Sequence, residues 1–231
     1  MNPAHTKEQI ETLLRVEKFP YHRVELPYGL HTPGRDRSAT RDLIFPPSLA
    51  GRSVLDVGCA LGYFCFEAEK RGAARVLGTE LKADRFRQAG LLRDALGSRV
   101  EFQQRDILAE PPAEPFDYVC FLNVIHHLPE PVSALRQLAA LTRERLIVEF
   151  PTLADARFRR GSGLRFPWLF ARLPLIGVSS MGPDIEQTFV FTPAAIRRIL
   201  QDHRPLFAKV EFTPSPMPGR MIALCTKAAS A

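Results

Sequence analysis

Acidic side chains and glycines at the ends of predicted strands are the residues best suited to do chemistry. The stretch VLDVGCALGYF at 54–64 predicts a strand that ends near Asp56, a turn at Gly58 and a helix that opens at Gly62. The two glycines let the backbone approach a ligand with no side chain in the way. Because Ala60 occupies the middle position, this is not the dinucleotide fingerprint G-x-G-x-x-G. Asp56 beside such a turn suits a ligand with an amino acid group, whose ammonium would meet the carboxylate.

Two further strand ends carry acids. The predicted strand RVLGTE at 75–80 ends in Glu80, which can accept hydrogen bonds from both hydroxyls of a ribose. The strand RVEFQQRD at 99–106 ends in Asp106, which can accept a hydrogen bond from the amine of adenine while Ile107 covers the ring. Ligands bind at the carboxyl ends of parallel strands, so three such ends in order predict one site. An ordinary turn and solvated strand ends are the alternatives.

Two adjacent histidines, His126 and His127, follow the predicted strand FDYVCFLNV at 116–124. Metal binding would need further ligands at suitable spacing, and nothing local supplies them, so no metal site is predicted. Two interpretations remain open. One ring packs over a cofactor while the other caps a backbone carbonyl, or one ring is a general base, for which an imidazole of pKa about 6.5 is suited.

Strands alternate with helices from residue 53 onward, which predicts an α/β fold with a parallel sheet. Helices are expected over 6–18 and 192–203, with Thr6 and Thr192 as their N-caps. The last two strands can form a hairpin that adds one antiparallel strand. The predicted strands cover residues 53–58, 75–80, 99–106, 116–124, 145–150, 207–214 and 219–227.

Charge and cysteine usage give weaker indications. The net charge of +6 fits an acidic partner such as RNA, a nucleotide or an anionic lipid, but it also fits an arginine-rich composition with scattered arginines. The four cysteines show no metal-type spacing and are expected to be buried in a reducing compartment. No signal-peptide pattern and no apolar run long enough for a bilayer are found, so a cytoplasmic protein without a transmembrane segment is expected.

The chain divides by pattern into a lead-in or cap segment at 1–50 and one domain at 51–231, with an insert at 151–188. A loop this long in a compact domain is usually functional, so the insert is expected to be a lid or acceptor-binding cap. A packing or dimer surface is the alternative, and the chain is expected to be a monomer or homodimer. The insert combines large apolar residues with arginines: Phe158, Phe166, Trp168, Phe170, Leu173, Ile176, Arg157, Arg159, Arg160, Arg165 and Arg172.

The order of these motifs resembles that in class I S-adenosylmethionine (SAM)-dependent methyltransferases. LDVGCALG, GTE, RDI and FDYVCFLNVIHHLPEP follow one another over about residues 50–150. The resemblance implies SAM as cofactor and a Rossmann-like doubly wound fold, with a mostly parallel seven-stranded sheet and one antiparallel strand. Ala60 replaces the usual glycine, so a slightly narrower pocket is expected.

The resemblance also implies the site residues. In this family the segment after the fourth strand passes beside the sulfonium and the acceptor, so His126 is the first candidate for the base. Glu149, at the end of the fifth strand, is the alternative base, or else a solvated strand end. The implied cofactor-binding residues are Asp56, Gly58, Cys59, Ala60, Gly62, Glu80, Leu81, Asp106, Ile107, Leu122, Asn123 and His127.

Two more segments are similar to one branch of the family. YHRVELPYGLHTPG at 21–34 and FVFTPAAI at 189–196 resemble segments of the branch that includes the bacterial carboxymethyltransferases of the tRNA wobble uridine. Those enzymes recognise the extra carboxylate of a carboxylated SAM with a lysine, a tryptophan and a tyrosine. The tyrosine position falls on His126, and a gap-free alignment offers neither of the other two. The resemblance therefore favours plain methyl transfer.

Three functions follow from the sequence. The first is a SAM-dependent methyltransferase that acts on O or N of a small, lipophilic or aromatic acceptor. The second is a tRNA-modifying methyl- or carboxymethyltransferase, against which no separate RNA-binding module and no basic-aromatic stripe are found. The third is a protein that binds SAM without catalysis.

Overall fold

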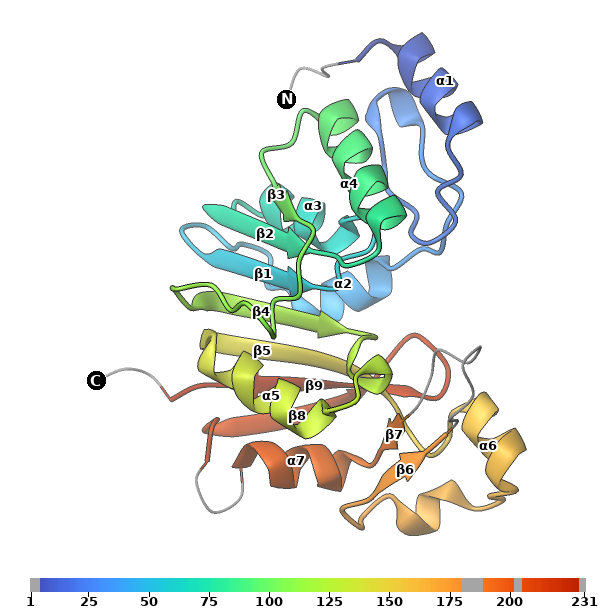
Figure 1. Cartoon of the computed structure of the whole chain (residues 1–231), viewed down its shortest axis with the longest axis vertical. Helices are drawn as coiled ribbons and strands as arrows, with labels where there is room; N and C mark the ends of the chain where they lie inside the picture. Colours follow the sequence, from blue (N-terminus) through green and yellow to red (C-terminus); the bar gives the residue numbers. More distant parts are fainter. Residues whose placement is uncertain (1–4, 180–188, 202–204, 229–231) are drawn as a thin grey trace. The chain divides into compact units, whose positions relative to one another are not determined.

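The protein consists of two compact units, Met1–Pro111 and Pro112–Ala231 (Figure 1). A computed structural model describes residues 5–179, 189–201 and 205–228. The main strands run in the order β3-β2-β1 in the first unit and β4-β5-β9-β8 in the second. The pairings within each unit are parallel except the two that β9 makes. The predicted Rossmann-like, mostly parallel seven-stranded sheet with one antiparallel strand is thereby confirmed.

In the first unit, β1 and β2 are largely buried because helices cover them. Helix α3 packs on β1 and β2, and α4 packs on β3. The elements in chain order are α1 (Lys7–Val16), the 3-10 turn η1 (Pro27–Gly29), α2 (Ser38–Ile44), β1 (Ser53–Val57), α3 (Tyr63–Lys70), β2 (Arg75–Thr79), α4 (Ala83–Leu96) and β3 (Glu101–Gln103).

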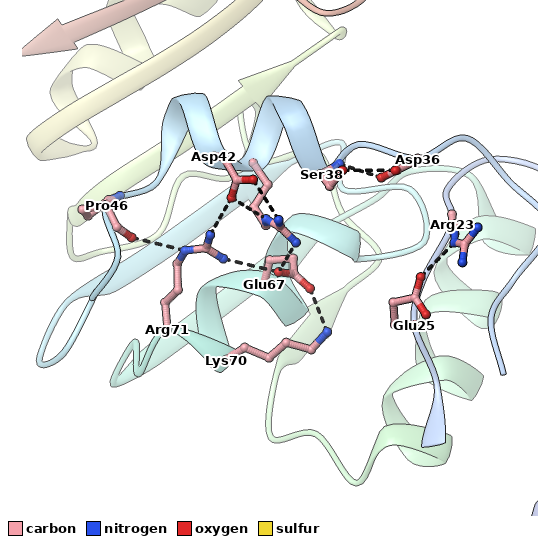
Figure 2. A network of polar contacts seen from close by, with 10 residues as sticks. Arg23, Glu25, Asp36, Ser38, Asp42, Pro46, Glu67, Lys70 and Arg71 are labelled. Atoms are coloured by element: carbon pink, nitrogen blue, oxygen red, sulfur yellow. Dashed lines mark hydrogen bonds and ion pairs between the residues drawn. The ribbon is translucent and has the colours of Figure 1, made fainter. Parts of the chain in front are cut away.

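The lead-in is tied to α3 by a cluster of charges around Glu67, which Figure 2 shows. Glu67 is buried, and its carboxylate accepts from Arg41 of α2 at 3.2 Å. Lys70 at 2.7 Å and Arg71 at 3.3 Å also pair with it, while Arg71 reaches Asp42 at 3.0 Å. Three cations offset the cost of burying one carboxylate, so α2 is fixed to the helix that follows the glycine turn.

In the second unit, α5 packs on β5 and α7 packs on β8. The elements are β4 (Phe116–Leu122), the turn η2 (Ile125–His127), α5 (Pro131–Ala140), β5 (Thr142–Pro151), α6 (Ala156–Ser162), the turn η3 (Pro167–Phe170), β6 (Ile176–Val178), β7 (Phe189–Phe191), α7 (Pro193–Gln201), β8 (Lys209–Pro214) and β9 (Arg220–Thr226). The hairpin of β8 and β9 was predicted. The antiparallel pair β6–β7 was not.

The predicted insert at 151–188 is partly regular. It contains α6, η3 and β6, and residues 180–188 lie outside the described part of the chain. Gly177 allows β6 to pack closely, because a Cβ there would lie 2.9 Å from Val190 and 3.2 Å from the ring of Phe158. Among the described residues, no helix is long and apolar enough to cross a membrane. All four cysteines are buried thiols that form no disulfide bond.

One predicted strand end is wrong. The strand predicted at 99–106 ends at Gln103, so Asp106 lies in a turn beyond β3 and not at its end. The Asp106 carboxylate accepts a hydrogen bond from the Leu108 amide at 2.9 Å. A local side-chain bond of this kind is typical of a turn, so Asp106 belongs to the turn and not to the strand.

Candidate functional site

The glycine turn of the first unit is held against the end of β2. The amides of Gly58 and Cys59 donate to the Thr79 carbonyl at 2.8 and 2.9 Å. Gly58 has φ 71° and Gly62 has φ 78°, a region that glycine adopts without strain. Ala60, between them, also has a positive φ of 51°. The turn therefore requires glycine at both of the predicted positions.

Glu80 is buried beside this turn, one residue after β2. Its Oε2 accepts from the Ala60 amide at 3.0 Å, and its Oε1 accepts from the Lys82 amide at 2.9 Å. Each carboxylate oxygen has two acceptor positions, so Glu80 can hold the turn and still accept further hydrogen bonds. Leu81, the next residue, is exposed.

Asp56 in β1 is another buried acid of the first unit, with 2% of its surface exposed. The Cys65 thiol donates to its Oδ2 at 3.6 Å. Burial, and to a lesser degree the negative charge of Glu80, raises the pKa of Asp56 to about 7, while the Cys65 hydrogen bond and Arg37 oppose the rise. A cation bound beside Asp56 would favour its ionised form.

Asp106 and Ile107, the residues predicted to bind adenine, differ in their exposure to solvent. Asp106 is exposed in its turn, whereas Ile107 is buried. The Ile107 side chain is therefore packed inside the unit, while Asp106 lies in a polar turn that is accessible to solvent.

The second unit forms its own polar cluster where β4 and β5 end. Asn123, with φ 60°, follows β4, and its amide donates to the Glu149 carbonyl at 3.1 Å. The Asn123 side-chain amide donates to one oxygen of the Glu149 carboxylate, and the Ser215 hydroxyl donates to the other. Arg220 donates to the Asn123 side-chain carbonyl. Glu149 is 0% exposed, so the alternative of a solvated strand end is wrong.

His126 lies in the same cluster and is 2% exposed. Its Nε2 is 3.4 Å from Arg220 Nη1, and its Nδ1 is buried with no hydrogen-bond partner among the described residues. Burial, followed by the charges of His127, Arg220 and Arg157, lowers the pKa of His126 to about 2. The ordinary imidazole pKa expected from the sequence is therefore wrong, and the ring stays neutral.

Three residues of this cluster were not predicted: Ser215 and Met217 from the segment that joins β8 to β9, and Arg220, the first residue of β9. The Asn123 side chain donates to the Met217 sulfur at 3.4 Å as well. No local pattern marks these residues, because they meet Asn123 and Glu149 only in the folded chain. Within residues 5–179, 189–201 and 205–228, no group of three His, Cys, Asp or Glu side chains is arranged to hold a metal.

Comparisons with known sequences place the chain among methyltransferases. A family model described as a methyltransferase domain matches residues 31–203. A tRNA U34 carboxymethyltransferase of Alteromonas mediterranea is 33% identical over 147 residues, 58% of this chain and 43% of that protein. A ubiquinone biosynthesis O-methyltransferase of Neisseria meningitidis is 32% identical over 109 residues, 46% of this chain and 45% of that protein. The chain thus spans less than half the length of these relatives.

Solved structures share the fold. A magnesium protoporphyrin IX methyltransferase from Synechocystis PCC 6803 with bound SAM has a TM-score of 0.55 at 21% identity, covering 78% of this chain and 72% of that one. The N-terminal domain of EvdMO1, crystallised in the presence of SAH and D-fucose, has a TM-score of 0.68 at 14% identity, covering 97% and 98%. The fold and the family model define a Rossmann-like protein of the class I methyltransferase type. The chain belongs to the family of methyltransferase domains.

Proposed function

We propose that the protein is a SAM-dependent methyltransferase that transfers a methyl group to O or N of a small, lipophilic or aromatic acceptor. The observation that carries this proposal is the Glu80 carboxylate, held 3.0 Å from the Ala60 amide at the glycine turn. The turn and the acid lie at the carboxyl ends of β1 and β2, where α/β proteins bind nucleotides. Membership in the methyltransferase family supports the same activity.

The first unit offers groups that fit each part of SAM. Asp56, buried and with a raised pKa, is suited to a ligand ammonium, and Glu80 has acceptor positions left for the ribose hydroxyls. Ile107 would cover the adenine ring, with Asp106 accepting from its amine. The other first-unit residues proposed for the donor side are Gly58, Cys59, Ala60, Gly62 and Leu81. Leu122, Asn123 and His127, which the sequence resemblance also implies, belong to the second unit.

We assign the acceptor side to the cluster of the second unit. His126 is neutral, so its ring can accept a hydrogen bond from an acceptor hydroxyl or amine. Its low basicity makes it a weak proton acceptor in itself. Both oxygens of Glu149 accept hydrogen bonds from neighbouring side chains, so Glu149 serves first as a positioning residue for Asn123 and only second as a base.

The chemistry requires mainly orientation. SAM supplies a methyl group that its positively charged sulfur already activates. The side chains of the protein hold the donor and the acceptor in line and exclude water, and orientation of this kind contributes about 7–11 kcal/mol in the best cases.

An RNA acceptor is the second candidate, because a tRNA U34 carboxymethyltransferase is among the relatives and the net charge is +6. Phosphate contacts would make binding fall steeply with salt. A salt series of tRNA binding therefore tests it: flat, weak binding favours the small acceptor.

The domain organisation, the oligomeric state and the location of the protein are also proposals. We propose that residues 1–50 form a cap segment on a methyltransferase domain at 51–231, that part of the insert 151–188 acts as a lid, and that the protein is a cytoplasmic monomer or homodimer. Limited proteolysis with and without SAM tests the cap and the lid, because a closing segment becomes protected when the ligand binds.

The donor site is tested by calorimetry with SAM. Gly58→Val should abolish binding, because valine cannot adopt φ 71° without strain. Glu80→Ala should weaken binding by roughly 1–3 kcal/mol, the contribution of hydrogen bonds to a charged acceptor. Gly51→Val is the matched control, since Gly51 has φ 74° and an added Cβ there has no atom within 4 Å. Unchanged affinity in both site variants would refute the donor site.

Activity is tested by incubating cell metabolites with the enzyme and labelled SAM, and searching for a mass gain of one methyl. Release of adenosylhomocysteine distinguishes catalysis from binding alone. SAM binding without either product would favour the non-catalytic protein.

A further inference from the structure

The exposed side chains of the insert are both apolar and cationic. Residues 156–179 contain five arginines and no aspartate or glutamate, and all five arginines are exposed. Large apolar side chains are exposed among them, and Trp168 is 68% exposed. We call this set the insert surface: the arginines 157, 159, 160, 165 and 172 together with Phe166, Trp168, Leu169, Leu173, Ile176 and Val178.

The segment is nevertheless fixed from within. The Asp155 carboxylate caps α6 by accepting from the Arg157 amide at 2.9 Å. The Thr192 hydroxyl donates to the Leu173 carbonyl at 2.6 Å and accepts from the Leu175 amide at 3.0 Å. The inward contacts use Phe158 and Gly177, so the exposed side chains are presented on an anchored scaffold. In Figure 1, α6 and β6 lie beyond the ends of the main strands of the second unit.

The residue types of the insert surface indicate which kind of partner binds it. A second copy of the same face would set five positive charges against five, which opposes self-association. Single-stranded RNA would use the arginines and the rings but has no use for exposed leucine, isoleucine and valine. An anionic membrane uses all three classes: arginines bind the lipid phosphates, tryptophan favours the interface, and aliphatic side chains enter the acyl region.

We propose that the insert surface docks this protein onto the surface of an anionic lipid bilayer. The proposal goes beyond the methyltransferase activity and does not depend on it. The docked segment would adjoin the acceptor cluster of the second unit, because Thr152 donates to the Gly219 carbonyl at 2.8 Å, next to Arg220. A lipophilic acceptor dissolved in the bilayer would then reach the enzyme without crossing water.

Trp168 makes the test direct, because it is the single tryptophan of the chain. The full-length protein is titrated with vesicles of phosphatidylcholine alone and with vesicles that also contain phosphatidylglycerol. We expect a blue shift of tryptophan emission and co-sedimentation with the anionic vesicles only, both weakened by salt. Brominated lipids should quench the emission, since the indole would lie at the acyl boundary.

Two double variants separate the contributions. Arg159→Ser with Arg160→Ser should weaken vesicle binding by about fivefold for each arginine. Leu169→Ser with Val178→Ser should abolish the blue shift and leave circular dichroism unchanged. Arg99→Ser and Val16→Ser, exposed positions of the first unit, are the matched controls and should bind like the wild type.

Other outcomes overturn the proposal. Equal binding of the control and insert variants would remove the insert surface from docking. A tryptophan response to single-stranded RNA but not to vesicles would assign the surface to nucleic acid. A dimer in light scattering without vesicle binding would assign it to a second copy. Because the readout is emission and sedimentation, failure here leaves the test of methyl transfer untouched.

Discussion

Asp56 and Glu80 are two buried acids of the first unit, and their burial has a measurable cost. Glu80 is satisfied by two backbone amides, whereas Asp56 has a weak thiol donor and a pKa raised to about 7. In the folded protein Asp56 therefore keeps its proton over a pH range in which the unfolded chain has lost it. Stability falls as pH rises from the ordinary aspartate pKa to about 7, because the folded state binds more protons there.

Asp56→Asn should therefore stabilise the ligand-free protein at about pH 8 and have little effect at about pH 4. The affinity for SAM should change with pH in the direction opposite to stability. The wild-type affinity should fall about tenfold for each pH unit below about 7, since Asp56 must lose its proton to meet an ammonium. Thermal melts and calorimetry across pH check both parts. An affinity that is independent of pH in the wild type would separate Asp56 from the ammonium.

His126 illustrates how burial changes a residue's role. With a pKa of about 2 it is neutral throughout the working range, so it contributes no pH inflection near the ordinary imidazole value. His126→Gln should still lower turnover by about 10²-fold, the lower end of the range for a positioned proton acceptor, because a weak base contributes less. SAM affinity should change little.

The measurement is the rate at saturating SAM across pH, in the wild type and in His126→Gln. Saturation removes the effect of Asp56 on SAM binding. Near-normal turnover of the variant would show that the ring only packs. An inflection near 6–7 that the variant loses would show that the bound acceptor restores an ordinary pKa to His126.

At the scale of elements, the entry to α3 depends on one glycine. A Cβ on Gly62 would lie 2.4 Å from the Phe102 ring, and φ is 78°. Gly62→Ala should lower the free energy of unfolding by roughly 1–3 kcal/mol through backbone strain and this clash. Gly90→Ala, in α4 with no atom within 4 Å of the added Cβ, should raise it by roughly 0.5–1 kcal/mol. Urea denaturation checks both, and equal effects would contradict the role assigned to Gly62.

Local signals were enough to predict most elements. The Thr6 and Gln9 capping box appears as predicted at α1, and Thr192 caps α7. Sequence patterns did not predict the elements that depend on contacts with residues far away along the chain. The helix α2 lies in a Pro- and Gly-rich stretch and is held by Glu67 from α3, while β6 has three residues that are ordered by pairing with β7.

The two parts of the candidate site also differ in how much of them the sequence could predict. Gly58 and Glu80 could be found because each follows its strand directly along the chain. Arg220 and Ser215 could not, since they reach Asn123 and Glu149 across 97 and 66 residues. The neutral state of His126 was also hidden, because sequence does not give the burial that sets its pKa.

At the scale of the whole molecule, the form of SAM that serves as donor distinguishes the chain from one of its relatives. The chain is 33% identical to a tRNA U34 carboxymethyltransferase over 147 residues. The sequence resemblance to that branch implies that its tyrosine position is His126 here and that its lysine and tryptophan have no match. Arg41, a possible substitute reader of a carboxylate, is already paired with Asp42 and Glu67. The pattern over the chain thus favours plain SAM.

Competition binding between SAM and carboxylated SAM tests this preference. We expect SAM to bind at least as tightly as carboxylated SAM. Desolvation of the extra carboxylate costs free energy, and no dedicated side chain forms a compensating bond with it. Arg41→Gln should leave the ratio of the two affinities unchanged, and Arg35→Gln serves as the second comparison. A clear preference for carboxylated SAM that is lost in Arg35→Gln or Arg220→Gln would show that an arginine has replaced the missing lysine and tryptophan. The protein would then belong functionally with the carboxymethyl-transferring relatives.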